Sequence, residues 1–131
     1  MLRIPSLLAI VCMLSIVFSA HFKSDSPLTK LMRTMAADMK KARVEIIAGK
    51  KISNFGKNYT KINSAKPSSE SKKGDQFKEF ASTFLVQMDR FKNASSESAK
   101  MEFNALAKTC VHCHETYCPG PITMLRKLQI P

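Results

Sequence analysis

The sequence predicts an all-α protein, an antiparallel four-helix bundle, from the spacing of its apolar residues. After residue 20, four segments carry apolar residues three and four positions apart, which places them on one face of an α-helix. No stretch of this part shows the apolar and polar alternation of a half-buried strand. The connections are short or of modest length, and this favours helices that neighbour one another around a shared core.

The first helix is expected to begin at Ser26 and Pro27, a capping residue followed by a proline in the first turn. Gly49 is expected to end it. Between them, six apolar residues alternate by four and three positions: Leu28, Met32, Met35, Met39, Ala42 and Ile46.

A second and weaker helix is expected where apolar residues recur after Gly49. Gly56 and several polar residues weaken this segment, whose apolar positions are Ile52, Phe55, Tyr59 and Ile62. Residues 64–74 contain proline, serines and lysines without an apolar period, which predicts a loop.

The third and fourth helices have the clearest apolar stripes. The third is expected to begin near Asp75, and its stripe is Phe77, Phe80, Phe84, Met88 and Phe91. Ser95 or Ser96 is expected to cap the fourth, with Glu97 in its first turn. The stripe of the fourth helix is Ala99, Phe103, Leu106, Cys110, Cys113 and Tyr117, and residues 119–121 (Pro-Gly-Pro) are expected to end it before a short tail.

The first twenty residues have the pattern of a secretory signal, which leaves one domain over residues 21–131. Arg3 supplies a positive charge, residues 4–18 are nearly all apolar, and the small residues Ser19 and Ala20 mark a cleavage site. An uncleaved membrane anchor is the alternative, although the apolar run is somewhat short for a span of ~20 residues.

Residues 110–114, Cys-Val-His-Cys-His, form the most informative motif of the chain. C-x-x-C-H is the attachment site of a c-type haem, in which both thiols bond to the haem vinyl groups. The following residue, His114, is then placed to bind the iron from the proximal side. On a helix, Cys110, Cys113 and His114 share one face, whereas His112 lies on the opposite side and is expected in solvent. We therefore expect one covalent haem c near the end of the last helix.

Two other interpretations of these cysteines stay open. Cys110, Cys113, Cys118 and one histidine could form a small zinc-binding module, although structural zinc pairs are usually separated by longer loops. A dithiol redox pair would normally follow a strand, and none is predicted. With haem attached, Cys118 is left over and is expected to be a buried or flanking free thiol.

Together these features resemble the cytochrome c′ family, four-helix bundles with C-x-x-C-H near the C-terminus, including their low-spin, methionine-ligated relatives. The matching residues are Cys110, Cys113, His114 and Tyr117. The resemblance implies that Tyr117 packs on the haem or bonds to a propionate. The next position departs from the pattern, because Cys118 stands where the family has arginine or lysine.

The first helix also resembles the family segment that covers the distal face of the haem, over residues 31–39. Low-spin members have a methionine ligand at the position that matches Met32, so the resemblance implies Met32 as the sixth ligand of the iron. Met35, one turn later, is the second choice. Methionines at this spacing otherwise serve as fillers of a core.

The expected function is that of an exported monohaem cytochrome in the periplasm, which transfers single electrons and is not an enzyme. Methionine and histidine ligation raises the reduction potential of a haem, which suits a carrier. If no methionine binds the iron, the alternative is a five-coordinate, high-spin haem protein that binds small gases such as NO or CO.

The charge balance indicates what kind of partner the chain attracts. Lysine and arginine number 21 against 10 acidic residues, a formal net charge of +11. Such an excess favours an acidic redox partner protein or peripheral contact with a membrane surface. Nucleic acid is not expected as a partner of an exported protein, and the sequence leaves a homodimer open.

Overall fold

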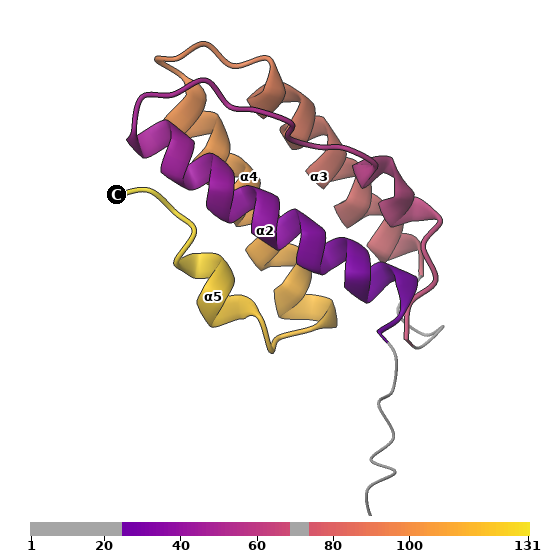
Figure 1. Ribbon diagram of the computed structural model, residues 1–131. Coiled ribbons are helices and arrows are strands. Elements are labelled where there is room, and N and C mark those ends of the chain that lie inside the picture. Colours follow the sequence, from indigo (N-terminus) through magenta and orange to yellow (C-terminus); the bar gives the residue numbers. More distant parts are fainter. Residues whose placement is uncertain (1–24, 69–73) are drawn as a thin grey trace, which may run out of the picture.

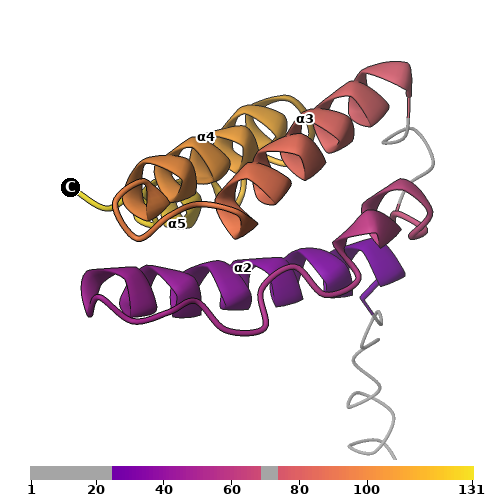
Figure 2. The same cartoon turned by 90° about the horizontal axis from the view of Figure 1, so that it is seen from above.

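The computed structural model describes residues 25–68 and 74–131, and this part of the chain is helical, without strands (Figure 1). The predicted secretory signal lies outside the described residues. The elements are α2 (Pro27–Ile47), the 3-10 helix η1 (Tyr59–Asn63), α3 (Asp75–Lys92), α4 (Ala99–Tyr117) and α5 (Ile122–Arg126). Figure 2 shows α2 on one side of the molecule and α3, α4 and α5 on the other.

Helix α2 begins and ends where the sequence predicted. The Ser26 Oγ accepts a hydrogen bond from the Thr29 backbone N–H at 3.1 Å, and Pro27 occupies the first turn. Gly49, at φ +63°, follows the helix in the left-handed conformation that glycine adopts readily. Four residues of the predicted stripe are buried, namely Leu28, Met35, Met39 and Ala42.

Helices α3 and α4 pack against each other through aromatic side chains. Phe77 of α3 meets Tyr117 near the end of α4, with ring centroids 5.7 Å apart. Phe91, near the end of α3, meets Phe103 near the start of α4 at 5.5 Å. Contacts therefore run in opposite order along the two helices, and they join the end of α4 to the start of α3.

Helix α4 begins later than predicted. Its first residue is Ala99 and its N-cap is Ser98, so Glu97 lies before the helix and Glu102 is the acidic residue of the first turn. Ser95 still caps the turn that precedes the helix, because its Oγ accepts the Ser98 backbone N–H at 3.3 Å. The end agrees with the prediction, since α4 stops at Tyr117, directly before residues 118–121.

The prediction of an α-helix for the second segment is wrong. After α2 the chain runs back along the bundle without α-helix and forms only η1 (Figure 1). Asn54, Gly56 and Asn58 have φ values of +54°, +83° and +63°, and such left-handed residues interrupt a right-handed helix. The apolar positions still contribute to the core: Tyr59 and Ile62 are buried, and the partly buried Ile52 and Phe55 pack against the core cluster.

The C-terminal segment is part of the fold rather than a loose tail. It forms α5 and buries Leu125, Leu128 and Ile130. The Asn104 side chain of α4 holds its end by two hydrogen bonds of 2.8 Å, donating Nδ2–H to the Ile130 carbonyl and accepting the Ile130 N–H at Oδ1. This docking places α5 beside the end of α4 that carries the cysteine motif.

Candidate functional site

The last turns of α4 carry the C-x-x-C-H residues at the edge of a cavity of ≈ 320 Å³. The first three turns of α2 and the start of α5 form its other walls. From the motif, Cys113 and His114 line the cavity, and Tyr117 follows one turn later. The remaining lining residues are Ser26, Leu28, Thr29, Met32, Arg33, Ala36, Pro67, Ser68, Phe77, Cys118, Pro121, Met124 and Leu125. A cavity of this size lies in the range of small-molecule and cofactor sites, roughly 300–1,000 Å³.

The imidazole of His114 is oriented by the end of its own helix. Its Nδ1 lies 2.9 Å from the carbonyl oxygen of Cys118. A carbonyl oxygen only accepts hydrogen bonds, so Nδ1 carries the hydrogen and the neutral ring has its lone pair on Nε2. Metal-binding histidines typically donate their second ring N–H in this way. The Cys118 N–H donates in turn to the His114 carbonyl at 3.1 Å, which ties the two residues together.

The two thiols of the motif lie in different surroundings. Cys113 lines the cavity, whereas Cys110 is not among the lining residues and packs against the hydrophobic core. Burial raises the pKa of the Cys110 thiol to about 12, and the neighbouring Cys113 adds to the shift. Burial also raises the pKa of Cys113 to about 11, with a contribution from Cys118. Both thiols of the haem-free chain are therefore protonated at neutral pH.

The structure separates the two methionines that the sequence offered as ligands. Met32 is half-buried and lines the cavity together with His114. Met35 is 6% exposed, belongs to the core and does not line the cavity. Of the two, Met32 is the one whose position fits a ligand.

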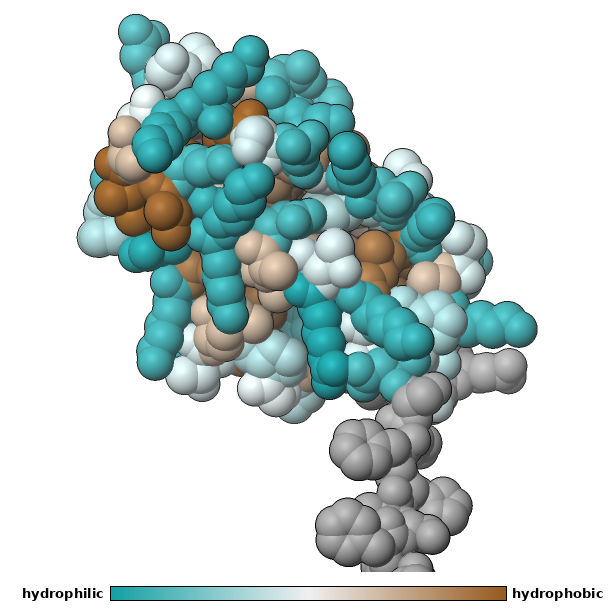
Figure 3. All heavy atoms as spheres, viewed as in Figure 1, coloured by the Kyte–Doolittle hydropathy of each residue, from teal (hydrophilic) through white to brown (hydrophobic). Residues whose placement is uncertain are grey.

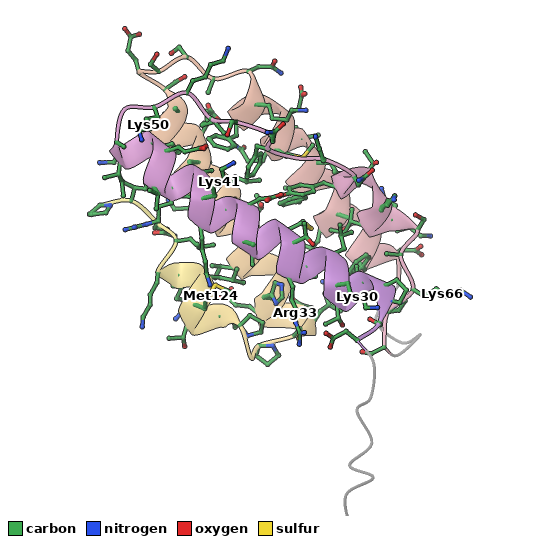
Figure 4. All side chains as sticks on the ribbon, viewed as in Figure 1. Lys30, Arg33, Lys41, Lys50, Lys66 and Met124 are labelled. Atoms are coloured by element: carbon green, nitrogen blue, oxygen red, sulfur yellow. The ribbon has the colours of Figure 1, made fainter. Side chains whose placement is uncertain are left out.

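A second methionine in the cavity was missed by sequence reasoning. Met124 lies on α5 (Figure 4), is half-buried and lines the cavity, as Met32 does. The spacing of Ile122, Leu125 and Leu128, three positions apart, was the signal that this segment forms a turn of helix with an apolar face.

Tyr117 is held against α3 while it lines the cavity. Its ring meets Phe77 and Phe80 edge to face, at centroid distances of 5.7 and 6.0 Å. Its hydroxyl donates to the Gln76 Oε1 at 3.5 Å, at the long limit of a hydrogen bond. The predicted contact of Tyr117 with a haem is compatible with this position.

His112 lies outside the cavity, as predicted, with a side chain that is 74% exposed.

In the described ranges, 25–68 and 74–131, no three histidine, cysteine or acidic side chains gather in a way that could hold a metal ion. The zinc interpretation therefore gains no support from the arrangement of Cys110, Cys113 and Cys118. None of the helices in the described part of the chain is long and apolar enough to cross a membrane.

Comparison with known proteins adds no relative to this description. No family model, no curated protein and no solved structure matches the chain.

Proposed function

We propose that this protein is an exported monohaem c-type cytochrome that transfers single electrons and is not an enzyme. One observation carries the proposal: His114 of a C-x-x-C-H motif lines a cavity with Nδ1 bonded to the Cys118 carbonyl, which leaves Nε2 free to bind iron. In this proposal Cys110 and Cys113 hold the haem by thioether bonds, and the three long helices with the segment after α2 correspond to an antiparallel four-helix bundle.

The cavity has the donors and the lining that a low-spin haem requires. Met32 supplies a thioether sulfur from α2, and His114 of α4 lines the same cavity. Apolar side chains such as Leu28, Phe77 and Leu125 form much of the wall, which limits access of water. The haem, when bound, supplies the iron that gains and loses one electron, and Met32 with His114 raises its reduction potential.

Two polar features of the lining suit the remaining parts of a haem. Arg33, which also pairs with Asp25, and the hydroxyl of Thr29 can bind the propionate carboxylates. No carboxylate lines the cavity in the part of the chain that the structure describes.

An acidic redox partner is the partner that we propose for the cavity end of the molecule. Arg33 lines the cavity, and Lys30 and Lys66 lie near the same end of α2 (Figure 4). The Leu28 N–H donates to the Lys66 carbonyl at 3.0 Å, which holds the loop at this end. Positive charge beside a haem steers an acidic protein to the place where electrons leave. The periplasmic location is also part of the proposal and rests on the sequence alone, which leaves a homodimer open.

A second function, gas binding, is favoured if Met32 does not reach the iron. The α2 wall then presents Leu28 and Ala36, apolar side chains that leave one side of a haem open to NO or CO.

The optical spectrum of the protein, purified from a host that attaches haem, tests the proposal. We expect a red protein with one haem per chain that survives acid extraction, and a low-spin ferric form with a methionine charge-transfer band. A high-spin, five-coordinate spectrum supports gas binding instead. Colourless protein with both thiols free, or with stoichiometric zinc, rejects the haem.

A further inference from the structure

A second cavity lies at the other end of α2, and lysines surround it. Its volume is ≈ 600 Å³, and Lys50, Lys51 and Lys92 line it from the end of α2 and the end of α3. No aspartate or glutamate is among the lining residues, and none of the three lysines forms a salt bridge in the described ranges. Three unpaired positive charges around one hollow repel one another, and a bound anion would relieve this repulsion.

The same cavity also has apolar lining residues. They are Ile46, Ile52 and the buried Phe91. Apolar lining residues do not favour the binding of a soluble inorganic anion. An anionic lipid, in contrast, has both a charged headgroup and an apolar chain.

Two large apolar side chains lie exposed near the same end of α2, outside the lining of the cavity. Val44 is 64% exposed and Ile47 is 58% exposed, three positions apart near the end of α2, so they share one face of the helix. Figure 3 shows apolar atoms gathered among hydrophilic ones at the end of the molecule where α2 ends. Lysines around exposed apolar side chains are typical of surfaces that rest on anionic membranes.

The position of this surface argues against a redox partner as its occupant. Ile46 follows Met32 by 14 residues of one continuous helix, which at 1.5 Å per residue places these two lining residues roughly 21 Å apart along the helix axis. Figure 4 shows Lys50 at one end of α2 and Lys30, Arg33 and Lys66 toward the other. A partner bound at Lys50 would therefore stand away from the proposed haem cavity.

We propose that the end of the molecule formed by Val44, Ile47, Lys50, Lys51 and Lys92 docks on anionic phospholipid. The lysines bind the phosphate headgroups, and Val44 and Ile47 enter the interface between headgroups and acyl chains. The first cavity then faces away from the membrane and stays accessible. This proposal does not depend on haem, so it stands or fails separately from the proposed function.

Sedimentation with lipid vesicles tests the proposal on the protein as its host processes it. We expect binding to vesicles of phosphatidylcholine with phosphatidylglycerol, little binding to phosphatidylcholine alone, and weaker binding as salt is raised. The triple substitution K50E/K51E/K92E should lower the affinity for the anionic vesicles at least roughly tenfold, because each lysine at such a surface contributes about 1 kcal/mol. V44S/I47S should lower it by roughly fivefold or more.

The matched control is K30E/K61E/K66E, which changes the net charge equally away from the proposed surface. It should bind the anionic vesicles severalfold more tightly than K50E/K51E/K92E, and circular dichroism checks that both triples fold. Equal loss in the two triples would show attraction by net charge alone and would overturn the proposed site. Equal binding of the unchanged protein to neutral and anionic vesicles would overturn it as well, as would unaltered binding of V44S/I47S.

Discussion

The imidazole of His114 donates its Nδ1 hydrogen to the carbonyl oxygen of Cys118, 2.9 Å away and four residues later in the chain. This bond uses the carbonyl that helix α4 leaves without a helical partner at its end. It selects the tautomer with a free Nε2, and it fixes the ring at the wall of the cavity. Cys118, which departs from the cytochrome c′ pattern, thus supports the proposed ligand His114 through its backbone carbonyl. This support does not depend on the Cys118 side chain.

The Cys118→Ser substitution should therefore leave haem content and the optical spectrum unchanged. The bonding carbonyl is kept, and serine removes only a thiol on an exposed residue. Haem content is measured as the pyridine haemochrome per mole of protein. Cys113→Ser is the contrasting variant, because it should remove one thioether and shift the haemochrome band. A large loss of haem in Cys118→Ser would mean that the thiol itself takes part in attachment.

Met32→Ala should convert a low-spin iron to high-spin while the haem stays attached. Alanine removes the sulfur that α2 presents to the cavity and leaves the α4 motif intact. Electronic absorption and electron paramagnetic resonance of the ferric protein give the spin state. An unchanged low-spin spectrum would exclude Met32 as the ligand.

Met124→Ala and Met35→Ala separate the remaining sulfurs. Met124 shares the cavity, so a high-spin iron in Met124→Ala but not in Met32→Ala would assign the ligand to α5. Met35 is buried in the core, and its loss should reduce the free energy of unfolding by about 2–5 kcal/mol without a change of spin state. Urea unfolding followed by circular dichroism measures the second effect.

The long helices were predictable because their apolar stripes and caps are local features. Ser26 and Pro27 set the start of α2, and the phenylalanines of α3 repeat at helical spacing. The second segment, residues 52–62, has the same spacing but forms no α-helix, only the 3-10 helix η1. Its Asn54 and Asn58 adopt the left-handed conformation, which apolar spacing does not register, and a Cβ on Gly56 would stand only 3.2 Å from the Met88 sulfur. Periodicity alone therefore identified which residues are buried and misjudged the backbone that carries them.

The candidate site was predictable where it rests on a motif and not where it rests on docking. Cys113, His114, Tyr117 and Met32, which the motif and the resemblance singled out, line one cavity from two distant segments. Met124 enters through α5, and the spacing of Ile122, Leu125 and Leu128 indicates this turn of helix but not where it docks. Its docking involves buried Leu125 and Leu128 and the two Asn104 bonds to Ile130, which are tertiary contacts. The raised pKa of Cys110 likewise follows from burial, which only the fold determines.

Asn104→Ala should loosen the C-terminal segment. The change removes two hydrogen bonds to Ile130, which together contribute about 1–3 kcal/mol to the free energy of unfolding. Urea unfolding measures the loss, and carboxypeptidase digestion should shorten the variant faster than the unchanged protein. Asn93→Ala is the control, because Asn93 makes an exposed hydrogen bond within the end of α3 and should cost less. Equal stability of the two variants would contradict a role of Asn104 in holding the segment.

The thiols of the haem-free, folded chain should react with iodoacetamide in the order Cys118, Cys113, Cys110. The thiolate is the reacting form, and raised pKa values of about 11 and about 12 leave Cys113 and Cys110 almost wholly protonated at neutral pH, whereas Cys118 is exposed. Because the thiolate fraction grows about tenfold per pH unit below the pKa, alkylation of the two slow thiols should accelerate about a hundredfold from pH 8 to pH 10.

Peptide mass spectrometry after timed quenching gives the three rates, with circular dichroism to check that the chain stays folded. In denaturant, where burial is lost, the three rates should converge. Cys110 reacting as fast as Cys118 in the folded chain at pH 8 would show that α4 does not pack its motif against the core.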